Sequence, residues 1–253
     1  MTHTVSLVIP VYNEAKRVGR AFNALSSFHT PKGIKIDEVI FVNDGSTDQT
    51  LKLLKSFKSK YHLRVITYKK NMGKGFAVRK GMLTSKAEYT LLMDADISTP
   101  LPQIEKFLPF MKANLDVIIG TRKNGHSTVT IHQSWVRENM GKVFTAISRQ
   151  ILGVKNITDF TCGFKMFKRE AKQAIFSRAK INRWGYDSEI IFLARKLGFY
   201  MVEKAVIWAN QKNTKVSLIK DSINSFRELL EIRFRYFIGG YNIVYQESDY
   251  NFS

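Results

Sequence analysis

The sequence predicts an α/β protein built on a mostly parallel sheet flanked by helices. In the first half of the chain, short apolar runs alternate with amphipathic stretches, which is the pattern of parallel strands joined by helices. The expected strands lie at residues 5–9, 38–42, 63–67, 89–93 and 117–119, and the expected helices at 14–28, 47–61, 76–85 and 102–112. Ligands of such sheets bind at the carboxyl ends of the strands, so functional residues are expected there.

Composition places the chain among ordinary globular proteins. Its 253 residues are 44% hydrophobic and 24% charged, enough for a sizeable core. Cys162 is the single cysteine, which excludes an intrachain disulfide, argues against a cysteine-based zinc site and fits a reducing compartment. The first apolar run is too short for a signal peptide, and no apolar run is long enough to span a bilayer, so we expect a soluble or peripheral protein.

The chain is strongly basic. Lys and Arg total 40 against 21 Asp and Glu, a net charge of +19. Such a charge favours anionic partners, namely nucleic acid, acidic lipid surfaces or phosphorylated substrates, although a solvated lysine-rich surface would also account for it. A nucleic-acid-binding function would rest on charge alone, because the sequence lacks zinc-finger spacing, an RNA-recognition signature and basic-region heptads. Nucleic acid is therefore not an expected partner.

Two carboxylates follow the fourth expected strand, in Asp94-Ala95-Asp96. Side chains two apart on a strand point to one side, so the two acids can converge. Close carboxylates are stable as anions when a cation lies between them, and hard oxygen ligands suit Mg²⁺ or Mn²⁺ completed by water and substrate phosphates. The alternative is that the pair caps a helix beginning near Pro100.

Three earlier strands also end in polar turns. The first turn runs from Pro10 to Glu14, and the second is Asn43-Asp44-Gly45-Ser46-Thr47-Asp48. The third, Asn71-Met72-Gly73-Lys74-Gly75, offers glycines that would let a ligand approach the backbone and a lysine that could meet phosphate. Its spacing matches neither a P-loop nor a dinucleotide fingerprint.

In order and spacing, residues 8–14, 43–48 and 94–96 resemble the family 2 inverting GT-A glycosyltransferases, which include the dolichyl-phosphate sugar synthases. The resemblance implies a Rossmann-like GT-A fold in which Pro10, Tyr12 and Glu14 line the nucleotide pocket and Asp44 contacts the base. It further implies that Asp94 and Asp96 hold Mg²⁺ or Mn²⁺ on the diphosphate. The family usually has an acid where this chain has Asn43, which keeps hydrogen-bonding capacity.

The second half resembles one branch of that family. Residues 159–167 and 183–189 are similar to the dolichyl- and polyprenyl-phosphate glucosyltransferases, and the match continues through residues 232–240. This resemblance implies transfer of glucose from UDP-glucose to a polyprenyl or dolichyl phosphate. Many relatives carry membrane-spanning segments that this sequence lacks, so a lipid acceptor would require another means of reaching the membrane.

Acceptor chemistry remains open between two classes. Arg122 and Arg137, the latter on an expected helix at 135–152, could orient an acceptor phosphate, which needs no strong general base. A sugar-hydroxyl acceptor would need a base, for which Asp187 or Glu189 is the candidate. The structural alternative is that Asp187 caps the helix running to Leu197. We expect catalytic roles for Asp96, Arg122, Arg137 and Asp187, with Gly73 and Lys74 at the donor.

The chain is expected to divide near residue 210. Residues 1–210 would form the catalytic domain, with a nucleotide-sugar half over about 1–120 and an acceptor half over 121–210, followed by a helix and tail at 211–253. In residues 216–238, one apolar stripe comprises Ile219, Ile223, Phe226, Leu230, Phe234 and Phe237, flanked by Lys220, Arg227 and Arg233. This stripe could lie in a membrane interface or pack on its own domain, and a second apolar face of Leu218, Leu229, Ile232 and Tyr236 complicates both interpretations. We expect the protein at the cytoplasmic face of a membrane.

Overall fold

A computed structural model describes residues 2–123, 129–131, 135–154, 156–209 and 218–243. Its centre is a seven-stranded sheet in the order β3-β2-β1-β4-β7-β5-β8, and a small second sheet pairs β6 with β9. All neighbouring strands of the large sheet are parallel except β7, which runs antiparallel to β4 and β5. The strands are β1 His3–Val11, β2 Ile34–Asp44, β3 His62–Tyr68, β4 Tyr89–Met93, β5 Val117–Thr121, β6 Val129–Ile131, β7 Phe164–Lys168, β8 Met201–Ala205 and β9 Trp208–Ala209.

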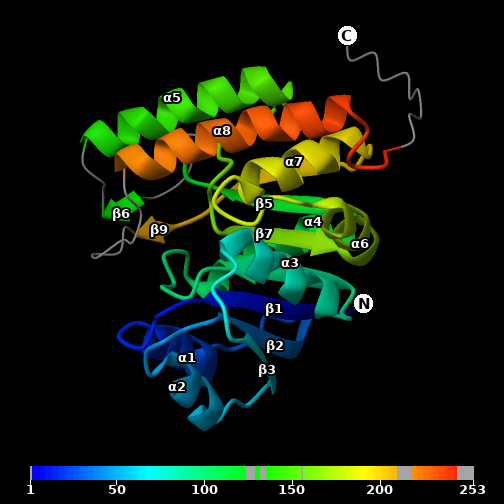
Figure 1. The fold of residues 1–253 in the computed structure, drawn as a ribbon. Coiled ribbons are helices and arrows are strands. Elements are labelled where there is room, and N and C mark those ends of the chain that lie inside the picture. Colours follow the sequence, from blue (N-terminus) through cyan, green and yellow to red (C-terminus); the bar gives the residue numbers. More distant parts are fainter. Residues whose placement is uncertain (1, 124–128, 132–134, 155, 210–217, 244–253) are drawn as a thin grey trace.

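Helices cover both faces of this sheet, as expected (Figure 1). Alternate residues of β1 enter two separate cores, with Val8 in one and Leu7 and Ile9 in the other. Because the strands are buried on both faces, they read as continuous apolar runs. The helices are α1 Val18–Ser27, α2 Thr50–Ser56, α3 Lys74–Thr84, the 3-10 helix η1 Leu101–Phe107, α4 Leu108–Lys112, α5 Trp135–Leu152, α6 Arg169–Arg178, α7 Tyr186–Lys196 and α8 Leu218–Phe237.

The expected strand set lacked β7 and β8 of the large sheet and both strands of the small one, β6 and β9. In β7 the apolar run is interrupted by Lys165, which is nevertheless fully buried, so the sequence conceals an interior strand. β8 lies at the sheet edge and is half-buried throughout, with Glu203 and Lys204 among its residues. Such a strand has neither a continuous apolar run nor a regular alternation of apolar and polar residues, so the sequence pattern does not reveal it.

Helix α8 is present, but the stripe does not pack on the protein's own domain. The described members Phe226, Leu230, Phe234 and Phe237 are exposed, whereas Leu229 and Ile232 of the second face are fully buried. Of the two alternatives for the stripe, packing on its own domain is therefore wrong for these four residues. Residues 210–217 and the side chains of Ile219, Lys220 and Ile223 lie outside the described residues, so the boundary near residue 210 stays a prediction. Within the described parts of the chain, no helix has both the length and the apolar character needed to cross a bilayer.

Candidate active site

The candidate site lies where β4 ends, between the loops that follow β1, β2 and β3. β4 ends at Met93 and leads directly into Asp94. Lys74, the first residue of α3, places its Nζ 2.6 Å from Asp94 Oδ1. Burial by itself would lower the pKa of Lys74, but the negative field led by Asp94 holds that pKa well above its usual value. A charged ammonium therefore neutralises the first carboxylate of the pair.

Aromatic rings enclose the same ammonium. Lys74 Nζ lies 5.5 Å from the ring centre of Trp184 and 5.9 Å from that of Tyr186. Both rings belong to the turn that begins α7, and the Gly185 N–H between them donates to Glu228 Oε2 of α8 at 2.6 Å. The turn at 183–186 is thus held from outside by α8 while its rings contact Lys74.

Asp96 is held by the loop that follows it, not by a helix. Its Oδ1 accepts the Ser98 N–H at 3.0 Å, and η1 begins after Pro100 without a side-chain cap. The capping interpretation of the two acids is therefore wrong. Ile97 adopts a φ of 56°, which a β-branched residue rarely accepts outside sites where the surrounding structure enforces it. Burial and the charge of Asp94 raise the pKa of Asp96.

Asp44 anchors the loop that carries Lys74. Its carboxylate accepts the Met72 and Gly73 N–H groups at 2.8 and 2.9 Å and the Asn71 side-chain amide at 2.7 Å. These bonds hold the end of β2 against the start of α3, one residue before Lys74. Contact between Asp44 and a nucleotide base stays a prediction.

Gly73 of that loop packs closely against another segment of the protein. A Cβ on Gly73 would lie 2.4 Å from the Asn182 carbonyl oxygen, and its φ is +104°. The close approach that we expected a ligand to make is therefore made by the backbone at Asn182. Binding of the nucleotide sugar at Gly73 stays a prediction.

The turns after β1 and β2 are tied together. The Asn13 N–H donates to Ser46 Oγ at 2.9 Å, and the Thr47 N–H donates to Asn13 Oδ1 at 2.8 Å. Glu14 forms a 2.5 Å ion pair with Arg17. Around this turn, Pro10 is half-buried near the end of β1 and Tyr12 is 38% exposed. The nucleotide contacts expected of Pro10, Tyr12 and Glu14 remain predictions.

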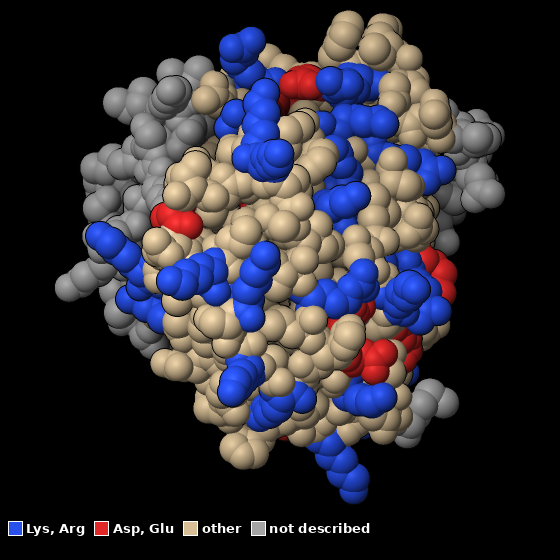
Figure 2. Space-filling model, turned by 60° about the horizontal axis from the view of Figure 1, so that its bottom comes forward, with Lys and Arg blue, Asp and Glu red and all other residues tan. Residues whose placement is uncertain are grey.

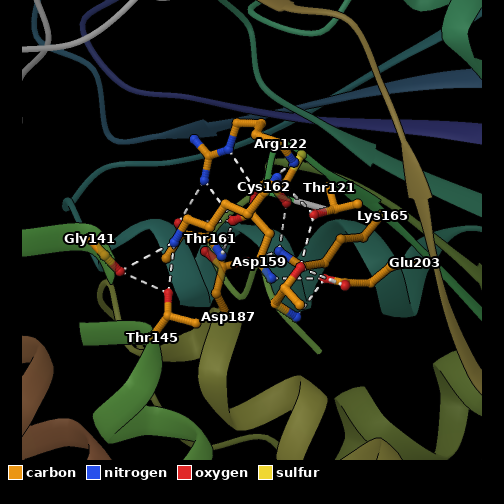
Figure 3. Close-up of polar contacts among 12 residues, drawn as sticks. Thr121, Arg122, Gly141, Thr145, Asp159, Thr161, Cys162, Lys165, Asp187 and Glu203 are labelled. Carbon is orange, nitrogen blue, oxygen red and sulfur yellow. Dashed lines mark hydrogen bonds and ion pairs between the residues drawn. The ribbon is translucent and has the colours of Figure 1, made fainter. Parts of the chain in front are cut away.

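Arg122 belongs to a buried cluster shown in Figure 3. Its Nε and Nη2 each lie 2.7 Å from an oxygen of Asp159, and Nη2 also donates to Thr161 Oγ1 at 2.9 Å. Burial opposes ionisation of both partners, yet their mutual attraction raises the pKa of Arg122 and lowers that of Asp159. The guanidinium also lies 5.1 Å from the ring centre of Trp208. Arg122 is therefore rigidly placed by the segment at 159–161.

Asp187 lies on the first turn of α7, whose N-cap is Gly185 without a side-chain cap. The alternative interpretation, that Asp187 caps this helix, is therefore wrong. Its Oδ1 pairs with the fully buried ammonium of Lys165, which also donates to the Cys162 carbonyl oxygen at 2.7 Å (Figure 3). Glu189 is equally engaged, because it accepts the Lys180 and Ile181 N–H groups and the Tyr241 hydroxyl. Both carboxylates are engaged by these partners, so neither is available as a general base in this structure.

Arg137 lies in α5, and its side chain is outside the described residues. Other residues of the site were missed as functional by sequence reasoning, although they lie inside motifs that it singled out. Gly163 is the clearest, because a Cβ there would lie 1.9 Å from Asp94 Oδ2. Asp159 and Lys165 carried a detectable signal, namely charged residues within runs of large apolar ones.

The carboxylates suit a divalent cation shared with a substrate. Among the described residues, no group of three or more His, Cys, Asp or Glu side chains could hold an ion by itself. Asp94 and Asp96 supply hard oxygen donors, and Mg²⁺ or Mn²⁺ typically takes one or two carboxylates and completes its shell with water and phosphate. The position of Lys74 at Asp94 shows that this carboxylate accommodates a positive partner. The residues therefore fit a metal that is bound together with a diphosphate.

The mostly parallel sheet flanked by helices, with acidic residues at the end of β4, is the architecture of the GT-A class of transferases. The chain belongs to glycosyl transferase family 2, whose model matches residues 6–176, and it is a glycosyltransferase. It is 34% identical to the dolichyl-phosphate beta-glucosyltransferase of Dictyostelium discoideum over 94% of this chain and 76% of that protein. The enzymes of the same name from Homo sapiens and Saccharomyces cerevisiae are 34% and 33% identical, over 96% and 94% of this chain and 78% and 76% of theirs.

Solved structures share the fold. The glucosyl-3-phosphoglycerate synthase of Mycobacterium tuberculosis, in complex with Mn²⁺, UDP-glucose and phosphoglyceric acid, superposes with a TM-score of 0.66 at 19% identity, over 92% of this chain and 80% of that one. The mannosyl-3-phosphoglycerate synthase of Rubrobacter xylanophilus gives a TM-score of 0.66 at 18% identity, over 99% and 79% of the two chains. The expected GT-A fold and family are thereby confirmed.

Proposed function

We propose that this protein transfers glucose from UDP-glucose to a polyprenyl or dolichyl phosphate, with inversion at the anomeric carbon. The observation that carries the proposal is the placement of Asp94, Asp96 and Lys74 where β4 ends. This arrangement supplies both carboxylates for a metal and a cation for phosphate. The relatives named dolichyl-phosphate beta-glucosyltransferase support the choice of sugar and acceptor.

On the donor side, Asp94 and Asp96 would hold Mg²⁺ or Mn²⁺. When bound, such an ion neutralises charge that develops on the leaving diphosphate. A structural neighbour of this fold was solved with Mn²⁺ and UDP-glucose, which supports a divalent ion and that donor. When the diphosphate binds, the Lys74 ammonium would leave Asp94 and pair with the diphosphate. The rings of Trp184 and Tyr186 would keep that ammonium near the reacting phosphates.

On the acceptor side, a phosphate is already an anion near neutral pH and needs orientation more than deprotonation. We assign this orientation to Arg122 and Arg137. The described bonds of the Arg122 side chain use Nε and Nη2, so Nη1 is the group that we assign to the acceptor. Pairing with buried Asp159 fixes the guanidinium before the acceptor arrives, which reduces the entropy lost on binding.

A phosphate acceptor also agrees with the state of the two acids on α7. Asp187 pairs with Lys165, and Glu189 accepts three hydrogen bonds, so a hydroxyl acceptor would have to displace one of them to find a base. We therefore assign Asp187 a positioning role, in which it holds Lys165 and adds to the negative field around Lys74. A lipid acceptor implies that the protein works at a membrane, and we propose that it is peripheral at the cytoplasmic face.

A donor panel tests this proposal. UDP-glucose, UDP-N-acetylglucosamine and GDP-mannose are each supplied with a short polyprenyl phosphate, with Mn²⁺ or Mg²⁺ and with chelator. We expect glucosyl transfer from UDP-glucose that stops on chelation and in the Asp96→Ala variant. Full activity of Asp96→Ala, or transfer to a free sugar hydroxyl in preference to the lipid phosphate, would contradict the proposal.

A further inference from the structure

The outer side of α8 presents large apolar side chains to solvent. Phe226, Leu230, Phe234 and Phe237 are 42%, 49%, 63% and 88% exposed, and Ile238 beyond the helix end is 59% exposed. Their spacing of four, four and three residues puts the four helical positions on one face. Contiguous exposed apolar surface of this kind marks an interaction site more often than isolated apolar residues do.

The fold does not need this face, because α8 is anchored through another. Leu229 and Ile232 are fully buried, and the Tyr236 ring packs edge-on against Phe192 with ring centres 5.3 Å apart. Lys196 of α7 lies 4.6 Å from the centre of the Tyr236 ring, and Glu228 accepts the Gly185 N–H. The helix is therefore seated on α7 by contacts that leave its outer face uncovered by the described part of the chain.

Basic side chains border the apolar face. Arg227 and Arg233 are both exposed and lie on opposite flanks of the four apolar residues. Farther around the helix, Arg235 is occupied by Glu231 at 2.7 Å. Long arginine side chains at the edge of an apolar strip can extend to phosphate groups while their stems remain on the apolar surface.

The helix beside α8 also exposes an apolar side chain. α5 packs beside α8, and the two form the outermost layer on one side of the molecule (Figure 1). Val143 of α5 is 59% exposed.

The charge of the whole molecule favours an anionic plane as the partner. The net charge is +19, and Figure 2 shows Lys and Arg spread over the face in view with few Asp or Glu among them. Figure 2 shows the lower side of the molecule in Figure 1, so basic charge also lies away from α8, and the apolar face with its basic borders determines which side docks.

From these observations we propose that the outer face of α8, bordered by Arg227 and Arg233, docks the protein onto an anionic lipid bilayer. The apolar side chains enter the boundary between headgroups and acyl chains, and the arginines bind lipid phosphates. The inference deepens the proposed function, because a lipid phosphate acceptor is reached at such a surface. Docking can be measured without any transfer reaction, so the two proposals can fail separately.

Vesicle sedimentation tests the docking face. We expect the wild-type protein to bind phosphatidylcholine vesicles containing phosphatidylserine, with affinity that falls as salt is raised. The triple variant Leu230→Ser/Phe234→Ser/Phe237→Ser should bind at least about tenfold more weakly, since three large apolar side chains leave the interface. Its circular dichroism and thermal unfolding should match wild type, because all three side chains are exposed.

The contribution of Arg227 and Arg233 is tested with two double variants, each of which removes two positive charges. Arg227→Gln/Arg233→Gln should lose most of the preference for anionic over neutral vesicles. Lys52→Gln/Lys55→Gln removes the same charge from exposed positions on α2, at the far end of the molecule, and should bind like wild type (Figure 1). Equal losses in both double variants would show a nonspecific effect of net charge and overturn the proposal.

Two further outcomes would overturn it. Wild-type binding by the triple variant would show that α8 is not the docking face. A wild-type dimer in solution that the triple variant converts to monomer, without vesicle binding by either, would show that a second copy of the chain covers this face. Turnover of the triple variant with a short, water-soluble polyprenyl phosphate should equal that of wild type, which separates docking from the transfer reaction.

Discussion

Lys74 Nζ and Asp94 Oδ1 lie 2.6 Å apart, so the ammonium at the start of α3 forms an ion pair with the first carboxylate after β4. A divalent ion that binds Asp94 must share or displace this contact. The released ammonium would then be available to contact a diphosphate. One lysine can therefore stabilise the carboxylate pair in the free protein and the leaving group in the complex.

Replacing this lysine should separate metal binding from turnover. In Lys74→Met the side-chain volume is nearly kept, and Asp94 loses its competing cation. We expect tighter binding of Mn²⁺ to the free protein, measured by calorimetric titration, together with a turnover on UDP-glucose lower by about two decades, as is typical when one charge-stabilising donor is removed. Lys80→Met, an exposed position on the same helix, is the control. A parallel fall in metal affinity and turnover would contradict the competition.

Gly163 should be intolerant of any side chain because of the carboxylate that it contacts. A Cβ there would lie 1.9 Å from Asp94 Oδ2, so Gly163→Ala must push the carboxylate or the start of β7 aside. We expect a loss of metal-dependent transfer greater than about a hundredfold and a lower free energy of unfolding by about 1 to 3 kcal/mol.

The matched control for that change is Gly19→Ala in α1, where nothing lies within 4 Å of the added Cβ. It should keep full activity and gain up to about 1 kcal/mol of stability from helix propensity. Steady-state transfer assays and urea denaturation measure both variants. Normal activity in Gly163→Ala would show that Asp94 does not need its observed position.

Asp187 should matter more for stability than for proton transfer. Asp187→Asn leaves the fully buried ammonium of Lys165 without its anion, which for buried pairs costs about 3 to 5 kcal/mol. Lys165→Met/Asp187→Asn should recover part of that loss in chemical denaturation. With a phosphate acceptor, turnover of the folded single variant should fall by less than the two to four decades, roughly, that loss of a general base costs. A larger fall, with stability unchanged, would instead make Asp187 the base for a hydroxyl acceptor.

Lys172 should make stability rise with pH in the alkaline range. Its ammonium is 1% exposed and donates to Ser85 O and Oγ, with no carboxylate among these partners. Burial, assisted by Arg169, lowers the pKa of Lys172 from 10.5 to about 8. Between these values the unfolded chain still binds a proton that the folded protein has released, so the free energy of unfolding contributed by this group increases with pH.

The contribution of Lys172 to the free energy of unfolding is measured by comparing wild type with Lys172→Met, because the other groups titrate equally in both proteins. We expect the stability of wild type relative to the variant to be constant below about pH 8 and to increase toward pH 10.5, by about 1.4 kcal/mol for each unit of pKa difference. Urea denaturation across this pH range measures it. A difference that stays flat would show that Lys172 is not destabilised by burial.

Local patterns were sufficient to predict most of the fold. β1, β2, β4 and β5 are buried on both faces, so each appears as a continuous apolar run, and the polar turns that follow them had to meet at one edge of a parallel sheet. The prediction therefore included Asp94, Asp96, Lys74 and Asp44 in one site. It could not include β7, because the burial of Lys165 depends on an ion pair with a residue 22 positions away.

The sequence by itself determined the α/β class, the family and the edge of the sheet that carries the carboxylates, since these follow from periodicity and from motifs contiguous in the chain. Only the tertiary structure decided which partner each charged group has: Lys74 with Asp94, Arg122 with Asp159 and Lys165 with Asp187. It also decided which of the two apolar faces of α8 is buried. The physical reason is that ion pairing and burial depend on distances between segments far apart in the chain, which no local pattern encodes.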